Sequence, residues 1–302
     1  MILAFETGKW STDNHLNGMM NALNGKYCRY FRDTVRGQKI EPARPLPPDT
    51  KHRWLDLEKD LQDQKANAYV FCGFMRGVEK IYKQALERNI DFYFLDHPYF
   101  FRREAIRTGK TNSNTKSLFR RLVKNDFNIS KITDINPDKY NYFRNIRPEK
   151  FVIKDWKKTG SNILVFPPSY WMCHTMGLDY EKLLEDTINE IKKHTDRNIV
   201  IRHKKQDGVN NPVSLTTDLD NAWVVVSMQS NAANESIMYG VPSFTIFNKY
   251  SSAVPMSLQD LSKIETPFYP DNRYEWLCNL CNHIFTIDEI TSGKAFRYVE
   301  QQ

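Results

Sequence analysis

The segment from Ser230 to Pro242 combines polar side chains with a spacing that could bind a phosphorylated ligand. Ser230 and Asn231 follow an apolar run typical of a buried strand, so they should begin a helix whose free N–H groups and dipole attract anions. One turn further, Glu235 could accept hydrogen bonds from ribose or sugar hydroxyls. Gly240 and Pro242 then end the helix and begin the next strand. A simple helix cap followed by a surface carboxylate would give the same spacing, so both interpretations stay open.

Strands and helices alternate along the chain, which indicates an α/β fold. In the N-terminal half, strands are expected at residues 2–5, 68–72 and 90–95, and helices near 15–23 and 78–88. In the C-terminal half, strands are expected at 163–166, 198–202, 223–227 and 243–247, and helices at 180–193 and 232–239. This alternation predicts two facing Rossmann-like domains, residues 1–150 and residues 151–302, with a helical tail at the C-terminus.

Asp96 and His97 follow the strand expected at residues 90–95. Polar turns at the carboxyl ends of parallel strands are where open α/β sheets bind ligands. His97 precedes Pro98, and a turn histidine with satisfied hydrogen bonds would fit equally well. Asp13 stands just before the first expected helix and could be only its cap.

The positive charge of the protein is concentrated in one short segment. The 302 residues include 43 Lys or Arg and 36 Asp or Glu, a net charge of +7. Residues 101–125 contain one acidic residue, Glu104, and eight basic ones, namely Arg102, Arg103, Arg107, Lys110, Lys116, Arg120, Arg121 and Lys124. The polar middle of this segment predicts a mobile loop followed by a short basic helix. Such a loop suits phosphate contacts with a polyanion, although charged runs are often only solvated surface.

Composition excludes several classes of protein. Hydrophobic residues make up 40% of the chain, and no apolar run approaches the ~20 residues of a membrane-spanning helix. The first strand lacks the flanks of a signal peptide, so we expect a cytoplasmic protein. Five scattered cysteines indicate reduced thiols rather than a disulfide framework. Cys278, Cys281 and His283 form half of a zinc-site pattern, but their helical spacing favours core packing.

The segment from Ser230 to Pro242, Ser-Asn-Ala-Ala-Asn-Glu-Ser-Ile-Met-Tyr-Gly-Val-Pro, resembles the donor-binding segment of GT-B-fold glycosyltransferases, where Glu-x4-Gly-x-Pro recurs. Its Ser-Asn start is most similar to the branch with bacterial sialyl- and Kdo-type transferases and related tailed-phage proteins. The run Ile201-Arg-His-Lys204 resembles the Arg/Lys-x-His-Pro motif of that branch, with Lys204 in place of proline. The tail from residue 276 to 296 resembles the end of a phage and bacterial glycosyltransferase-like family. The resemblance covers about residues 160–300.

The resemblance implies a nucleotide-sugar donor bound by Arg202, His203, Lys204, Ser230, Asn231 and Glu235. His203 and Lys204, with the amino end of the helix, would offset the charge on the departing phosphate. GT-B enzymes generally dispense with a catalytic metal, so neither a metal ion nor another cofactor is implied. Asp218 and Asp220 could be mistaken for a metal-binding Asp-x-Asp pair, but their Thr and Asn neighbours favour a turn or cap.

The resemblance also implies a general base in the facing domain, within ~3 Å of the acceptor hydroxyl. Asp96 and His97 rank first as candidates, followed by Asp13.

The resulting hypothesis is a glycosyltransferase that moves a sugar from a nucleotide sugar to a hydroxyl group. The basic segment and the phage-like tail favour hydroxymethylated pyrimidine in phage DNA as the acceptor, within the host cytoplasm. Phosphate contacts would come from Arg102, Arg103, Arg107, Lys110, Arg120 and Arg121. One alternative is an enzyme that builds a surface or capsular glycan, since acidic sugars also suit a basic loop. Another is a non-catalytic protein of the same fold that binds a nucleotide sugar or DNA.

Overall fold

The computed structural model describes residues 1–5, 10–28, 66–73, 78–100, 119–169, 172–173, 176–203, 213–246 and 251–302. The chain divides into two compact units. Unit 1 contains Met1–Asp126 and Ile284–Gln302, and unit 2 contains Phe127–His283. This division differs from the domains expected at 1–150 and 151–302, because residues 127–150 belong to unit 2 and the C-terminal segment returns to unit 1.

The described part of unit 1 contains a six-stranded sheet with the strand order β11-β5-β4-β3-β1-β2. Its strands are β1 (Ile2–Phe5), β2 (Lys26–Cys28), β3 (Ala68–Cys72), β4 (Asp91–Asp96), β5 (Phe119–Lys124) and β11 (Ile284–Thr286). The paired strands among β1 to β4 are parallel, whereas β5 is antiparallel to β4, and β11 is antiparallel to β5. The return of the C-terminal segment to unit 1 therefore rests on strand pairing.

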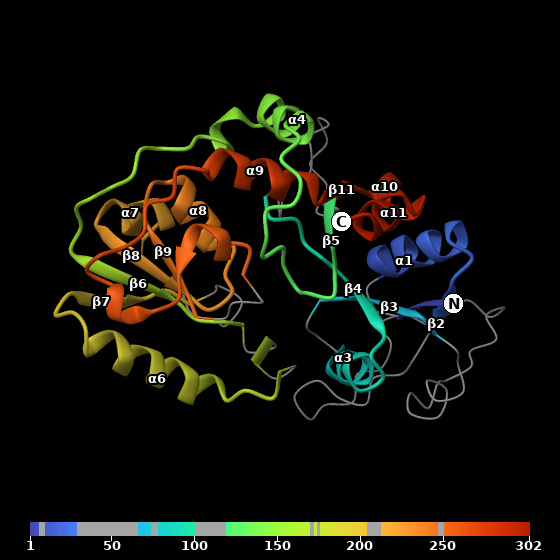
Figure 1. Cartoon of the computed structure of the whole chain (residues 1–302), viewed down its shortest axis with the longest axis horizontal. Helices are drawn as coiled ribbons and strands as arrows, with labels where there is room; N and C mark the ends of the chain where they lie inside the picture. The colour runs from blue at the N-terminus through green and yellow to red at the C-terminus, as the bar shows by residue number, and fades with distance from the viewer. Residues whose placement is uncertain are drawn as a thin grey trace. The chain divides into compact units, whose positions relative to one another are not determined.

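Helices cover both faces of this sheet (Figure 1). On one face lie α1 (Trp10–Ala22), α10 (Ile287–Thr291) and α11 (Lys294–Glu300), which share a buried cluster with side chains of β3, β4 and β5. On the other face, α3 (Val78–Glu87) buries Val78, Ile81 and Ala85 at helical spacing. Tyr82 of α3 packs edge-on against Phe92 of β4, with the ring centroids 5.4 Å apart. The sheet thus has an apolar interior on both sides.

The prediction of a short basic helix after the loop is wrong for residues 119–124, because they form strand β5. β5 pairs with β4 on one side and with β11 on the other, and Phe119, Leu122 and Val123 are buried. Its second partner comes from the far end of the chain, so no local pattern near residue 120 could reveal it. The loop expected at residues 101–118 lies outside the described residues.

The described part of unit 2 contains five parallel strands in the order β10-β9-β8-β6-β7. The strands are β6 (Asn162–Phe166), β7 (Asn198–Ile201), β8 (Ala222–Ser227), β9 (Ser243–Thr245) and β10 (Ser257–Leu258). The α-helices are α4 (Asp138–Ile146), α6 (Tyr180–Lys192), α7 (Leu215–Asp220), α8 (Ala232–Met238) and α9 (Arg273–Asn282). The described residues of unit 2 also form three short 3-10 helices, η1 (Pro148–Lys150), η3 (Val254–Met256) and η4 (Leu261–Lys263).

Helices cover both faces of the unit 2 sheet, and its strands accordingly bury apolar side chains on both faces. Alternate residues of β6 and β8, including Ile163 and Val224, form one buried cluster with Leu184 of α6. The residues between them, including Leu164 and Val225, form a second cluster on the side of α7 and α8 (Figure 1). The α/β class expected from the sequence is confirmed, with parallel strands in both sheets.

Within the described residues, no helix is both long and apolar enough to cross a membrane. Cys278 and Cys281 are free thiols on α9, where residues 276–282 are all buried. This burial agrees with the core packing expected from their spacing.

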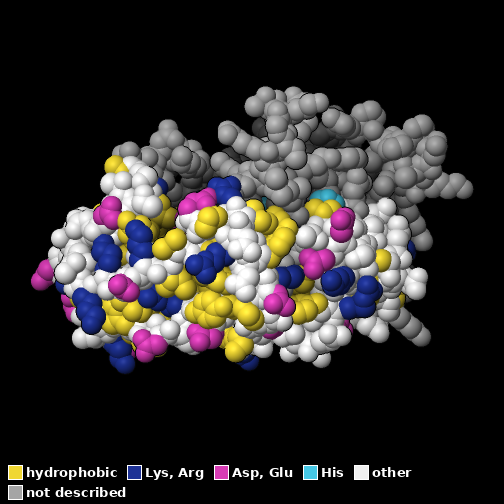
Figure 2. Space-filling view, turned by 90° about the horizontal axis from the view of Figure 1, so that it is seen from above, with side chains coloured by type: hydrophobic (Ala, Val, Ile, Leu, Met, Phe, Trp, Pro, Cys, Tyr) yellow, Lys and Arg dark blue, Asp and Glu magenta, His cyan; other side chains and the backbone are white. Residues whose placement is uncertain are grey.

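The described surface mixes charges of both signs with apolar side chains. Figure 2 shows Lys and Arg side chains interspersed with Asp, Glu and hydrophobic side chains on the face seen from above. The exposed apolar residues of unit 2 include Tyr142, Ile146, Val152 and Tyr274. Among the described side chains on that face, the basic groups do not gather into one continuous surface.

Candidate functional site

The parallel sheet of unit 2 changes its winding direction between β6 and β8. β6, the first strand of this sheet along the chain, has the second strand, β7, on one side and the third, β8, on the other. In a sheet of this order, a crevice forms at the carboxyl ends of the first and third strands, where ligands bind. Ser230 and Asn231 follow β8 at this position, so the segment singled out from the sequence lies at the expected ligand-binding edge.

The amino end of α8 has several of its N–H groups already bonded within the protein. Ser230 Oγ accepts a hydrogen bond from the Ala232 N–H at 3.2 Å, and the Ser230 N–H donates to Ser227 Oγ at 3.0 Å. The Ala233 N–H donates to the Ser230 carbonyl at 3.0 Å, and Asn231 makes no side-chain capping bond. A phosphate at this helix end would therefore have to displace the Ser230 hydroxyl or bind neighbouring groups.

Glu235 is exposed, whereas Asn234 and Ser236 on either side of it are buried. Desolvation raises the pKa of Glu235 above its usual value, while the positive charges of Lys150 and Arg202 act in the opposite direction. The carboxylate is thus accessible but closely surrounded by protein, with two cations near it. Such a group can accept hydrogen bonds from the hydroxyls of a bound ligand.

Gly240 ends α8 in the manner expected from the sequence. Its φ of +87° is in the left-handed region, and the Val241 N–H donates to the Ser236 carbonyl at 2.9 Å. The Gly240 N–H donates to the Ile237 carbonyl at 3.2 Å, which completes a Schellman motif. A Cβ at this position would lie 2.0 Å from the carbonyl oxygen of Asp155, so the close approach of the chain also requires glycine.

Arg202 and His203 follow β7 and have different surroundings. Arg202 Nη1 forms an ion pair with Asp218 of α7 and donates to the Val213 carbonyl at 3.0 Å. The two charged side chains are 14% and 15% exposed, so Arg202 anchors α7 beside β7. His203 Nδ1 lies 3.3 Å from the hydroxyl oxygen of Tyr180, at the start of α6. This contact can fix the orientation of the imidazole ring.

Asp218 and Asp220 have structural partners. Both lie in α7, which is capped by Ser214, rather than in a turn. Asp220 accepts a hydrogen bond from the hydroxyl of Tyr239. In the part of the chain that is described, no group of three or more His, Cys, Asp or Glu side chains could hold a metal ion. Lys204, the third basic residue of the motif, lies outside the described residues.

In unit 1, Asp96 forms an ion pair with a buried arginine. Arg121 Nη2 of β5 lies 2.9 Å from Asp96 Oδ2, directly across the antiparallel pair, and the guanidinium lies 5.1 Å from the ring centroid of Tyr99. His97 is half-buried after the end of β4. Asp13 lies inside α1 rather than before it, so it is not the helix cap.

Arg120 and Arg121 do not fit the phosphate contacts of an exposed loop. They are 6% and 4% exposed, because β5 is an inner strand whose side chains pack against both layers of unit 1. The remaining members of the predicted contact set lie outside the described residues; they are Arg102, Arg103, Arg107 and Lys110.

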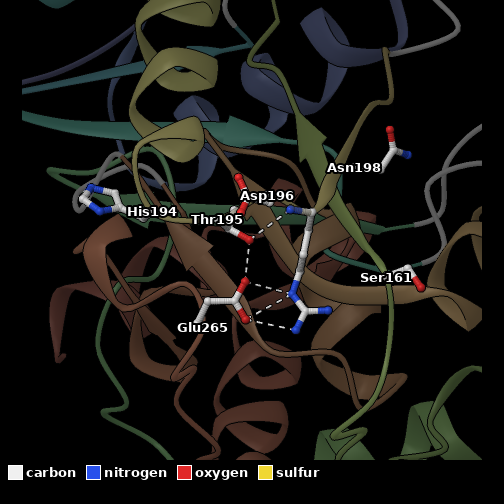
Figure 3. Close-up of a pocket in the computed structure, with 7 residues that line it drawn as sticks. Ser161, His194, Thr195, Asp196, Asn198 and Glu265 are labelled. Carbon is white, nitrogen blue, oxygen red and sulfur yellow. Dashed lines mark hydrogen bonds and ion pairs between the residues drawn. The ribbon is translucent and has the colours of Figure 1, made fainter.

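An open pocket of about 650 Å³ lies at the other end of the unit 2 sheet (Figure 3). Asn198 begins β7 and Ser161 precedes β6, so the pocket lies at the amino ends of these strands. Its other lining residues are His194, Thr195, Asp196, Arg197 and Glu265. The pocket is therefore separate from the edge that carries Glu235.

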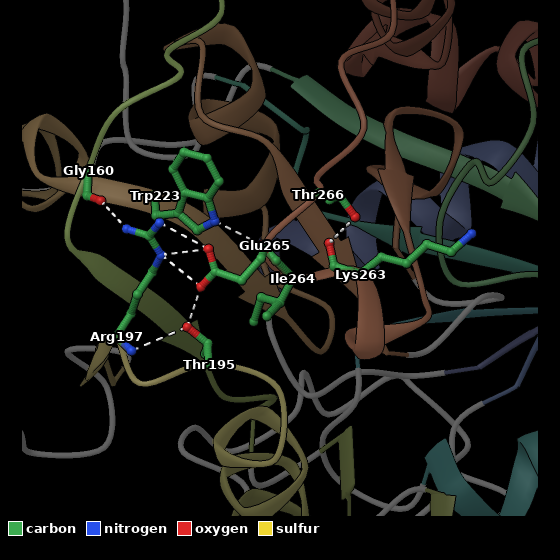
Figure 4. A network of polar contacts seen from close by, with 8 residues as sticks. All are labelled: Gly160, Thr195, Arg197, Trp223, Lys263, Ile264, Glu265 and Thr266. Atoms are coloured by element: carbon green, nitrogen blue, oxygen red, sulfur yellow. Dashed lines mark hydrogen bonds and ion pairs between the residues drawn. The ribbon is translucent and has the colours of Figure 1, made fainter.

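Arg197 organises the wall of this pocket (Figure 4). Its Nε lies 2.9 and 3.1 Å from the two carboxylate oxygens of Glu265, and Nη1 donates to the Gly160 carbonyl at 2.5 Å. The guanidinium also lies 4.3 Å from the ring centroid of Trp223, whose indole N–H donates to the Ile264 carbonyl at 2.8 Å. Every nitrogen of the guanidinium is engaged, with Nη2 also bonded to Glu265, so the network is structural.

The sequence matches no protein-family model and no curated protein. Among solved structures, it is similar to a beta Kdo 2,7 transferase, KpsC of Thermosulfurimonas dismutans, with a TM-score of 0.50, 11% identity and 99% of each chain covered. A beta Kdo 2,4 transferase of the same organism gives a TM-score of 0.47 and 9% identity over 92% of this chain and 89% of that one. UDP-GlcNAc 2-epimerase of Methanocaldococcus jannaschii gives 0.30 and 12% identity over the whole of both chains.

One of these comparisons bears on the class of fold. The match to the beta Kdo 2,7 transferase indicates a GT-B-like α/β fold, in agreement with the sequence resemblance. At 11% identity it shows the fold alone. None of the comparisons supports the resemblance to phage proteins, which stays a prediction.

Sequence reasoning missed two residues of the unit 2 site. Tyr180 contacts His203, and the charge of Lys150 acts on Glu235. Tyr180 is the first residue of α6 and directly follows its cap, Asp179. This helix start was the one local sign that Tyr180 lies near the end of a strand. Lys150 lies 85 positions before Glu235 in the sequence, and only the folded chain brings the two charges together.

Proposed function

We propose that the protein is a glycosyltransferase that binds a nucleotide sugar in unit 2. The observation that carries this proposal is the exposed Glu235 on the otherwise buried α8, at the winding change of a GT-B-like parallel sheet. A carboxylate at this position accepts hydrogen bonds from the ribose or sugar hydroxyls of the donor. Its crowded surroundings favour this role because hydrogen bonds to a partly desolvated carboxylate are stronger than those in water.

His203 is the proposed contact for the donor phosphates. Tyr180 orients its ring, and a protonated imidazole would offset the charge that develops on the departing nucleotide. Ser230 and Asn231 would contribute hydroxyl, amide and backbone donors at the start of α8. For Arg202, the ion pair with Asp218 supports a positioning role in place of the direct donor contact expected from the sequence.

In the proposed reaction, the acceptor hydroxyl oxygen attacks the anomeric carbon of the donor, and the bond to the nucleotide phosphate breaks. A general base takes the hydroxyl proton. His97 ranks before Asp96 as this base, because the Asp96 carboxylate is already paired with Arg121. Asp13 stays the third candidate. We propose that this chemistry needs no metal ion, since His203 and the donors of α8 would carry the charge.

We propose a glycan hydroxyl as the acceptor. The burial of Arg120 and Arg121 removes two of the residues expected to contact a DNA backbone, which weakens the case for a DNA acceptor. Hydroxymethylated pyrimidine in DNA is the alternative, and it depends on basic residues outside the described part of the chain.

The test is calorimetric binding with a panel of UDP-, GDP-, CMP- and dTDP-sugars. At least one should bind, and Glu235→Ala and His203→Ala should each weaken its binding by at least about tenfold, the loss of one or two hydrogen bonds to charged groups. Glu185→Gln, which removes a carboxylate from the exposed face of α6, is the matched control and should leave the affinity unchanged. Equal affinity in all variants would refute the site.

The same preparation can then be offered acceptors. Transfer of labelled sugar to an acidic oligosaccharide but not to hydroxymethylated DNA supports the glycan acceptor. Labelling of the hydroxymethylated DNA but not of the oligosaccharide would contradict the glycan acceptor and support a DNA acceptor.

A further inference from the structure

Arg120 is a buried cation with no counter-charge among the described residues. It is 6% exposed, and its Nη1 donates a long hydrogen bond of 3.5 Å to the carbonyl of the preceding residue, Phe119. Its Nε atom is fully buried and has no hydrogen-bond partner. Among the described residues, no Asp or Glu side chain forms an ion pair with it.

The neighbouring Arg121 has a counter-charge, Asp96, although its Nε is likewise buried without a hydrogen-bond partner. It is buried to the same extent, yet it pairs with Asp96 and lies over the ring of Tyr99. A buried guanidinium that lacks such partners destabilises the folded protein, because it has lost its hydration and gained no opposite charge. Buried polar groups of this kind call for an explanation, and an anion bound in the functional protein is one.

Arg120 lies on the side of the sheet formed by the carboxyl ends of the parallel strands, which is the side on which open α/β folds bind ligands. Arg121 is paired with Asp96, the last residue of parallel strand β4, so the start of β5 lies at the carboxyl ends of the parallel strands. On the other side of β5, Arg120 is paired with Phe285 of β11. His97 follows Asp96 directly, one residue beyond the last paired position.

Arg120 and Arg121 point to opposite faces because they are adjacent in a strand. Arg120 shares its face with Leu122 and Phe285, which belong to the buried cluster formed with α1, α10 and α11. The apolar surroundings exclude water from the guanidinium and strengthen its attraction for an anion. The 6% exposure of Arg120 does not suit contacts with the extended backbone of a nucleic acid.

We propose that Arg120 binds the carboxylate or phosphate group of a small ligand in unit 1. A guanidinium presents two parallel N–H donors that match the two oxygens of either group. This site lies on different elements from the nucleotide-sugar site of unit 2 and does not depend on it. It also replaces the DNA-backbone contact that the sequence suggested for Arg120 with recognition of one anionic group.

Calorimetric titration of the full chain with sodium phosphate and with sodium acetate, at constant ionic strength set by sodium chloride, tests this proposal. We expect saturable binding of at least one of the two anions. Phosphate binding without acetate binding identifies a phosphate site, and acetate binding identifies a carboxylate site. If neither anion binds the wild-type protein, the proposal is overturned, whatever the variants do.

The variants assign the binding to Arg120. Arg120→Met should weaken it at least tenfold, whereas Lys26→Met, which removes one positive charge from the exposed end of an edge strand, should change it less than twofold. Arg120→Lys keeps the charge but loses the planar fork and should weaken binding at least threefold, which provides a second test if Arg120→Met does not fold. Unchanged affinity in the Arg120 variants would overturn the proposal. Loss of anion binding in His203→Ala alone would overturn it as well, since the anion would then lie in unit 2.

Discussion

Replacing Gly240 with alanine should destabilise unit 2 and disturb the helix that carries Glu235. The positive φ of Gly240 costs alanine ~1–2 kcal/mol. The new Cβ would also lie 2.0 Å from the Asp155 carbonyl oxygen, so the adjoining chain would have to move. That movement would break the bonds from the Lys154 N–H to Met238 and from the Lys157 N–H to Gly240, at 2.8 and 2.7 Å. At about 1 kcal/mol for each hydrogen bond, the total loss is about 3–4 kcal/mol.

Gly177 supplies the matched control. It has a φ of +68°, and a Cβ there would meet nothing within 4 Å. Gly177→Ala should therefore cost only the backbone term of ~1–2 kcal/mol. Urea unfolding followed by tryptophan fluorescence measures both variants, with equal slopes required for the comparison. If Gly240→Ala is no more destabilising than Gly177→Ala, the close approach of Asp155 does not constrain this helix end.

Three further variants test other parts of the structure. Burial raises the pKa of Glu300, but hydrogen bonds from Lys124 and Tyr93 outweigh it and hold that pKa below its usual value. The folded protein therefore favours the charged carboxylate, so wild type should be more stable than Glu300→Gln at pH 7, by under ~1 kcal/mol. This difference should shrink as the pH falls below about 4.3, the ordinary pKa of Glu, and vanish below the lowered pKa of the folded protein. For Glu235 the sign is reversed: its raised pKa means that folding opposes its charge, so Glu235→Gln should slightly raise the melting temperature at pH 7, with no gain at pH 3. Arg197→Met should reduce the free energy of unfolding by about 2 kcal/mol through its lost ion pair, hydrogen bond and aromatic contact, with no change in nucleotide-sugar affinity. A weaker affinity in that variant would mean that the amino-end pocket takes part in donor binding.

Local patterns were sufficient for most of unit 2. The strands expected at 163–166 and 223–227 correspond to β6 and β8, and the helix expected at 180–193 corresponds to α6. These elements are long apolar or amphipathic runs between clear start and stop signals, such as the Asp179 cap of α6. The termination of α8 at Gly240 was equally readable, because a left-handed helix end strongly favours glycine.

Long-range pairing explains what the sequence did not reveal. β11 has three residues, and its partner β5 lies about 160 positions earlier, so neither the strand nor the return of the C-terminal segment to unit 1 has a local signal. The consecutive arginines of β5 suggested exposed surface, and only the fold shows that Asp96, from another strand, balances Arg121. In the candidate site, Ser230, Asn231 and Glu235 could be placed by pattern. The contact of Tyr180 with His203 and the effect of the Lys150 charge on Glu235 depend on tertiary structure.

A crystal structure of the protein with a bound nucleotide sugar tests the central proposal most directly. We predict that the donor lies at the carboxyl ends of β6 and β8, with a hydroxyl of the ribose or sugar within hydrogen-bond distance of Glu235 and a phosphate near His203. A donor bound at the amino-end pocket around Arg197, or one that touches neither Glu235 nor His203, would contradict it.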